Sequence, residues 1–223
     1  MRSLLKSGLL AIMITIAINS YGQTFGIKGG LNLSDTRYSP DEENLPGMNP
    51  GFHIGPVMEL DLNSVFSCET GILLTTKGFK INSFPPDETG IEEKYKLKIN
   101  LYYIDVPLNV KAKLKLNGFD IYGSAGPYLG IGVKGKGKYE SGDEKETSTL
   151  KFGPDKNLKR MEFGLNFGGG IEINSFLFGL NYGLGLTNTT QQEGVKTNNR
   201  VLSVSVGYRF RANKADNNAE ESY

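Results

Sequence analysis

The sequence lacks several features that define common classes of protein. Its 223 residues include no tryptophan, one cysteine and one histidine, and 25 basic against 24 acidic side chains leave a formal net charge of +1. A single cysteine, Cys68, forms neither an intramolecular disulfide nor a thiolate metal site. A charge balance this close to zero argues against a basic nucleic-acid-binding protein. We therefore expect no cofactor and no nucleic-acid partner.

Long hydrophobic runs are scarce as well. The run at residues 9–18 is ten residues of almost wholly apolar sequence, which is too short to cross a hydrocarbon core of about 30 Å as a helix. Arg2 and Lys6 precede this run and small residues follow it, which is the pattern of a cleaved secretory signal. We expect residues 1–22 to be that signal. Gln23 then begins the mature chain, where a lipoprotein would need a cysteine.

Apolar and polar residues alternate along much of the sequence. In residues 100–114 every even position from Tyr102 to Leu114 is apolar or aromatic, whereas most odd positions from Asp105 onward are polar. Successive side chains leave a strand on opposite faces, so this pattern predicts a β-strand. An ordinary strand has about 5–6 residues, but a tilted strand that crosses a bilayer needs about 9–11. The length and the alternation are typical of an outer-membrane barrel strand.

Seven other segments repeat this design. They lie near residues 24–34, 51–62, 66–77, 119–133, 160–173, 176–186 and 202–210. The connections alternate between long polar segments (35–49, 80–98, 134–157 and 187–199) and short turns (63–64, 117–118 and 174–175). Bacterial outer-membrane barrels have an even number of strands, short periplasmic turns and longer extracellular loops.

The predicted fold class is therefore all-β: an eight-stranded antiparallel transmembrane β-barrel with short periplasmic turns and four longer extracellular loops. The barrel occupies residues 23–210 and lies in the outer membrane with both termini in the periplasm. Residues 211–223 show no periodicity, so we expect a disordered periplasmic tail there.

The volume of the side chains indicates which face points outward. The apolar face carries about forty bulky side chains, far more than the interior of an eight-stranded barrel can hold. The opposite face is rich in glycine, which suits a crowded interior. Aromatic side chains on the outward face are expected to form the girdles at the two membrane interfaces. These residues are Phe25, Phe52, Phe66, Tyr102, Phe119, Phe163, Phe176, Tyr208 and Phe210.

Four segments resemble a known family: LYYIDVPLNVKAKL, ETGILLTTKGFK, GSAGPYLGIG and SVSVGYRF. They are similar to the PorT-type outer-membrane β-barrel domains of Bacteroidota. The resemblance implies the fold and the location, and the member that gives the family its name is similar to an accessory of a secretion system. The family pattern supplies no catalytic residue.

His53 is the one candidate for catalysis. Its position predicts an inward side chain near the extracellular end of the strand at 51–62, where Ser34 and Asp35 of the first loop could approach it. Some outer-membrane barrels are rim-active lipid-modifying enzymes that use such groups, but a lone histidine is more often a satisfied interior residue. We therefore favour a non-enzymatic protein, a surface-binding or envelope/secretion-complex accessory module, and keep the enzyme as the alternative. Its partners would be outer-membrane lipid and, through the loops, an envelope protein or a surface ligand.

The inward face also carries charged side chains of both signs. Buried charges persist only when they are paired, so we expect an ion-pair cluster that plugs the barrel instead of a conducting pore. The predicted members are Lys28, Glu59, Glu69, Lys111, Asp120 and Arg209.

The apolar pattern inverts at the far ends of two neighbouring strands. On the first strand the apolar residues are even-numbered as far as Leu74 and then odd-numbered, at Phe79 and Ile81. On the second strand they are odd-numbered first, at Leu97, Ile99 and Leu101, and even-numbered from Ile104 onward. Above a bilayer the outer face meets water, so apolar side chains gain by turning inward. We expect the barrel to extend beyond the membrane here, with apolar side chains closing its mouth. The alternative is a β-bulge that shifts the register without any extension.

Overall fold

The computed structural model describes residues 23–39, 47–81, 95–141, 144–154, 156, 158–191, 194 and 196–210. The predicted signal (1–22) and tail (211–223) lie outside these residues. No helix long and apolar enough to cross a membrane occurs in the described part of the chain. Ten strands make up the fold: β1 Gln23–Ser39, β2 Gly47–Asp61, β3 Phe66–Gly71, β4 Leu73–Ile81, β5 Tyr95–Leu116, β6 Phe119–Ser141, β7 Glu144–Leu150, β8 Met161–Ile173, β9 Phe176–Gly185 and β10 Lys196–Phe210.

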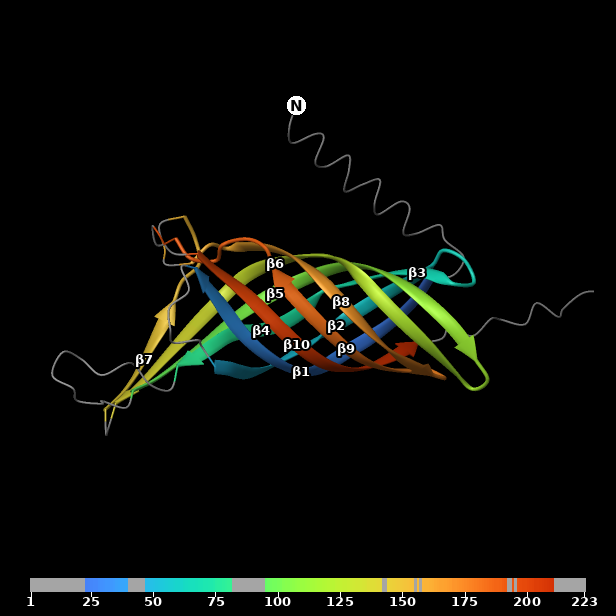
Figure 1. Ribbon diagram of the computed structural model, residues 1–223, viewed down its shortest axis with the longest axis horizontal. Coiled ribbons are helices and arrows are strands. Elements are labelled where there is room, and N and C mark those ends of the chain that lie inside the picture. Colours follow the sequence, from blue (N-terminus) through green and yellow to red (C-terminus); the bar gives the residue numbers. More distant parts are fainter. Residues whose placement is uncertain are drawn as a thin grey trace, which may run out of the picture.

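The strands close into an eight-membered antiparallel ring (Figure 1). The first and last strands pair along their whole length, from Phe25 opposite Phe210 to Ser39 opposite Lys196. β3 and β4 share one place in the ring, because both lie between β2 and β5 with an unchanged register on either side of Ile72. β7 pairs with β6 outside the ring. The predicted eight-stranded barrel is confirmed.

The two faces of the barrel differ as the alternation predicts. On β1, Phe25, Ile27 and Leu31 are exposed on the outside, whereas Asn32 and Ser34 are buried on the inside. An outward apolar face suits lipid, and ring closure leaves no strand edge unpaired in the hydrocarbon, where unsatisfied backbone groups cost several kcal/mol each.

The barrel has two unlike ends, which we call the turn end and the loop end. The turn end carries the hairpins around residues 62–65, 117–118 and 174–175. Six of the nine predicted girdle residues lie here: Phe25, Phe66, Phe119, Phe176, Tyr208 and Phe210. Tyr208 contacts both Phe176 and Phe210 edge to face, with ring centroids 5.2 and 5.6 Å apart. The other three, Phe52, Tyr102 and Phe163, lie toward the loop end, and Tyr102 is half-buried.

At the loop end, β5, β6 and β7 project beyond the neighbouring strands (Figure 1). The predicted loop at residues 134–157 is wrong in this respect, because β6 runs to Ser141 and β7 returns along it to Leu150. This lysine- and glycine-rich stretch has low strand propensity of its own. The end of β6 is nevertheless a strand because it pairs with the long β5, from Tyr95 opposite Ser141 onward.

The predicted apolar closure of the mouth is confirmed. Phe79 and Leu101 are buried, and Leu101 packs with Tyr103 and Phe152 in an apolar cluster. Ile99, Leu150 and Leu158 pack against this cluster. The alternative, a bulge at the inversion itself, is wrong for β4 and β5, which pair in unbroken register from Leu73 opposite Asp105 to Ile81 opposite Leu97. A bulge occurs on β6 instead, where the β5–β6 register shifts between Tyr102 and Tyr103 and leaves Val133 as an extra residue.

Candidate functional site

One group of buried charges gathers inside the turn end of the barrel around Lys111 of β5. The Lys111 ammonium Nζ lies 2.9 Å from Glu59 Oε2, 3.4 Å from Glu69 Oε2 and 2.7 Å from Glu172 Oε1. It also lies 4.3 Å from the centre of the Tyr122 ring. One cation thus bridges carboxylates from β2, β3 and β8, which are strands on different sides of the ring.

Each of these carboxylates has a second cation, in the pairs Lys28–Glu69, Lys113–Glu59 and Arg209–Glu172. We call these seven residues the turn-end cluster. Four positive and three negative side chains leave little uncompensated charge, which is the condition for stable burial. The cluster crosses the barrel and fills its interior at this level.

Five of the six predicted members belong to this cluster, and Asp120 does not. Asp120 is half-buried and lies opposite Glu172 and Lys115 in register. Within the described residues it forms no ion pair, because Glu172 on the neighbouring strand takes the contacts with Lys111 and Arg209. Lys113 and Glu172 complete the cluster in its place.

A second buried ion-pair group, the loop-end cluster, consists of Lys77, Asp105 and Glu162. Lys77 Nζ lies 3.1 Å from Asp105 Oδ1 and 3.4 Å from Glu162 Oε2. Glu162 also accepts hydrogen bonds from the Tyr128 hydroxyl at 2.6 Å and the Asn199 amide at 2.9 Å. We did not predict this cluster from the sequence, although Asp105 and Glu162 occupy inward positions of the predicted strands.

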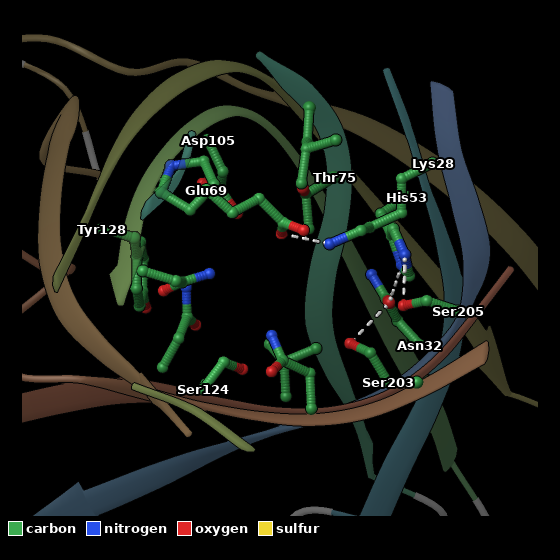
Figure 2. Close-up of a pocket in the computed structure, with 18 of the residues that line it drawn as sticks. Lys28, Asn32, His53, Glu69, Thr75, Asp105, Ser124, Tyr128, Ser203 and Ser205 are labelled. Carbon is green, nitrogen blue, oxygen red and sulfur yellow. Dashed lines mark hydrogen bonds and ion pairs between the residues drawn. The ribbon is translucent and has the colours of Figure 1, made fainter. Parts of the chain in front are cut away.

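Between the two clusters lies a cavity of about 80 Å³ (Figure 2). Lys28 and Glu69 border it on one side and Lys77 and Asp105 on the other, and each cation is paired with a carboxylate. The remaining wall combines apolar groups, such as Leu73, Pro107, Leu180 and Val201, with hydroxyl and amide groups: Asn32, Thr75, Asn109, Ser124, Asn166, Asn181, Ser203 and Ser205. A cavity of this size and polarity suits ordered water. No cluster of metal-ligating side chains occurs among the residues that the structure describes.

His53 lies at the edge of this cavity in a chain of hydrogen bonds. Its Nδ1 is 2.7 Å from Asn32 Oδ1, and its Nε2 is 3.0 Å from Ser205 Oγ. Asn32 Nδ2 donates to the carbonyls of Phe52 and Thr76, which fixes Oδ1 toward the imidazole. Because Oδ1 can only accept, Nδ1 carries the proton and Nε2 accepts from the Ser205 hydroxyl.

Gly30 makes this chain possible. It lies opposite His53 on one side and Ser205 on the other. A Cβ at residue 30 would lie 2.7 Å from His53 Cε1, so the missing side chain lets the imidazole reach across β1. Figure 2 shows His53, Asn32, Ser203 and Ser205 gathered on one wall of the cavity.

The partners predicted for His53 are wrong. Ser34 donates to the carbonyls of Asn49 and Gly78, and Asp35 accepts from Arg200 Nε at 2.7 Å. The observed order, Ser205 then His53 then Asn32, is the order of nucleophile, base and orienting group in hydrolases. The sequence signal for it was the inward position of all three residues, but their pairing depends on the register.

Comparison with known proteins agrees with this architecture. Residues 21–191 match the family model described as the outer membrane protein beta-barrel domain. Among solved structures, the attachment invasion locus protein Ail of Yersinia pestis is 16% identical over 85% of this chain and 100% of Ail, with a TM-score of 0.40. Neisserial surface protein A is 14% identical over 85% of this chain and 100% of its own, with a TM-score of 0.44. No curated protein matches the sequence. The chain belongs to the outer membrane protein beta-barrel domain family and is an outer-membrane β-barrel protein.

Proposed function

We propose that this protein is a non-enzymatic barrel with a plugged interior that acts through its loop end, as a surface-binding module or as an accessory of an envelope or secretion complex. The proposal places the short turns in the periplasm with both termini and the loop end outside the cell. Membership of the PorT-type group within the wider family is part of this proposal. It rests on the sequence segments that resemble that group.

The observation that carries the proposal is that the interior is blocked at two levels. The turn-end cluster and the loop-end cluster cross the barrel at two levels, and the apolar cluster of Leu101, Tyr103 and Phe152 covers the mouth above them. Opening a continuous water path would separate buried ion pairs, which costs several kcal/mol for each ion left alone. The projecting strands of the loop end are then the part of the molecule available to a partner.

We expect the purified protein to show no porin-like conductance in planar lipid bilayers, because its fixed charges are paired within the barrel. Current traces at constant voltage measure this directly, with a general porin reconstituted in the same lipid as the positive control. Reproducible single-channel steps of porin size would contradict the plugged interior.

A second candidate function is hydrolysis of an ester or acyl bond with Ser205 as nucleophile, which the chain Ser205–His53–Asn32 favours. His53 is only 6% exposed and faces a small cavity. Asn32 Oδ1 also accepts a bond from Ser203 at 2.9 Å, as in a structural polar network. These observations favour the non-enzymatic proposal.

A fluorophosphonate probe, which reacts with activated serines, separates the two candidates. We expect no adduct on the wild-type protein by intact-mass measurement, because the serine is held in a buried network. Ser205→Ala and Ser203→Ala are a matched pair of variants for peptide mapping. An adduct in the wild type and in Ser203→Ala that is lost in Ser205→Ala would identify an enzyme and refute the non-enzymatic proposal.

A further inference from the structure

The projecting sheet at the loop end carries lysines on one face. Three of them form a row across neighbouring strands: Lys80 on β4 lies opposite Lys98 on β5, which lies opposite Lys138 on β6. Three more flank this row on the same face. We call the set of Lys80, Lys96, Lys98, Lys134, Lys136 and Lys138 the lysine face.

The lysine face is the outer face of the sheet. The alternate residues of the same strands point inward. There Leu101 belongs to the apolar cluster at the mouth, Ile99 packs against it, and Gly135 and Gly137 are buried. The bulge at Val133 sets this arrangement on β6. Below the bulge the outward residues are odd-numbered and apolar, as at Ile131, and above it they are even-numbered lysines.

Among the described residues, this arrangement is electrostatically unfavourable. Like charges directly opposite on adjacent strands destabilise a sheet. None of the six lysines forms an ion pair with another described residue. The acidic side chain that the described strands place on this face is Glu140, opposite Lys96 and Lys145. A row of this kind is stabilised when an anion lies against it.

The position of the face identifies the source of that anion. Lys134 lies opposite Tyr102, an aromatic residue at the edge of the outward apolar band. From Lys134 to Lys138 the strand extends about 13 Å along its axis, which a tilt of about 35–45° reduces to about 10 Å along the membrane normal. The layer of polar headgroups begins directly outside the hydrocarbon and is about 5–8 Å thick on each side. The lysine face therefore begins at headgroup depth and points sideways, toward the surrounding lipid.

We propose that the lysine face binds the phosphate groups of the glycolipid in the outer leaflet, lipid A. Lysine ammonium groups bind phosphate as mobile point charges, and basic residues beside a bilayer are attracted to anionic lipid. The inference names a lipid partner for the loop end and rests on the proposed orientation of that end outside the cell. The barrel would then hold phosphorylated lipid along one side, against β4, β5 and β6.

The test is a titration of the full-length mature protein, in a neutral detergent, with fluorescent bisphosphorylated lipid A. The variant Lys80→Gln/Lys98→Gln/Lys138→Gln removes the row. The control Lys115→Gln/Lys159→Gln/Lys196→Gln removes the same charge from exposed lysines away from the face. We expect about tenfold or greater loss of affinity in the first variant and less than twofold change in the control. Dephosphorylated lipid A should bind the wild type as weakly as the first variant binds the phosphorylated form.

A second measurement shows whether a loss of affinity in the first variant comes from misfolding. Removing the row relieves like-charge repulsion, so the variant's thermal midpoint in detergent should equal or exceed that of the wild type. Unchanged affinity in the first variant, equal loss in the control, or undiminished binding of dephosphorylated lipid A would overturn the proposal. So would tight binding of soluble polyphosphate without binding of lipid A, because the partner would then be a free polyanion.

The orientation is tested separately, by treating intact cells that carry Lys138→Cys with a membrane-impermeant maleimide. Labelling is expected. Its absence would refute the proposed orientation and the assignment to the outer leaflet, while the titration would still decide whether the face binds lipid phosphate. The two experiments therefore distinguish an error in the proposed lipid binding from an error in the proposed function.

Discussion

Replacing Lys111 with methionine is expected to destabilise the barrel by about 3–5 kcal/mol, the usual cost of removing one member of a buried ion-pair group. Lys111 contacts Glu59, Glu69 and Glu172, all of them nearly inaccessible to solvent. Each carboxylate keeps a second cation, but no other described cation contacts all three. Because the chain has no tryptophan, the measurement is the folded fraction on cold gels across a urea series in lipid vesicles.

Two controls make this prediction specific. Lys115→Met changes an exposed lysine on the same strand and is expected to stay within about 0.5 kcal/mol of the wild type. Adding Glu172→Gln to Lys111→Met should recover part of the loss, because it removes one of the three carboxylates whose mutual repulsion Lys111 offsets. Unfolding of Lys111→Met at the wild-type urea concentration would show that the cluster does not hold the barrel together.

Replacing Phe152 with alanine is expected to release the described residues around Phe152 from the mouth without unfolding the ring. The Phe152 ring packs edge to face on Tyr103, with centroids 5.4 Å apart, and lies flat over Gly132. Truncating a buried phenylalanine costs about 3–5 kcal/mol. A loss of 3 kcal/mol in the local opening free energy raises the open population more than a hundredfold. Trypsin should therefore cut after Lys156 about a hundredfold faster.

The conservative variant Phe152→Leu keeps most of the buried area, so its cleavage rate should rise by about tenfold or less. The urea midpoint of the ring should be the same in both variants, because β8, β9 and β10 keep their pairings. Equal cleavage of wild type and Phe152→Ala would mean that the apolar cluster does not close the mouth.

The ring was predictable from the sequence because lipid outside and a crowded interior impose one strict alternation on every strand. The alternation also indicated that Lys28, Glu59, Lys111 and Arg209 point inward. It failed at the loop end, where the outer face carries lysines instead of apolar side chains and the period-two contrast fades. Residues 134–150 have no apolar stripe of their own, so their pairing was not readable before the neighbouring β5 was in place.

The partners within the interior were not predictable for a different reason. Alternation gives the face of a residue, but the contact depends on the register between strands and on how far one strand is shifted along the next. Asp120 and Glu172 point the same way and lie opposite each other, yet Lys111 pairs with Glu172 alone. His53 likewise finds Ser205, 152 residues away, while the nearer Ser34 bonds elsewhere.

The pairing of β1 with β10 has a consequence for how the protein is made. Phe25 meets Phe210 across a seam that no shorter piece of chain can form. Until β10 arrives, both β1 and β9 present open hydrogen-bonding edges, and a bilayer core penalises each unpaired backbone group. Insertion into the membrane is thus an event of the finished polypeptide, not of its first hairpins. The ring therefore closes only when β10 has been synthesised and has reached the membrane, which makes the pairing of β1 with β10 a late step of assembly.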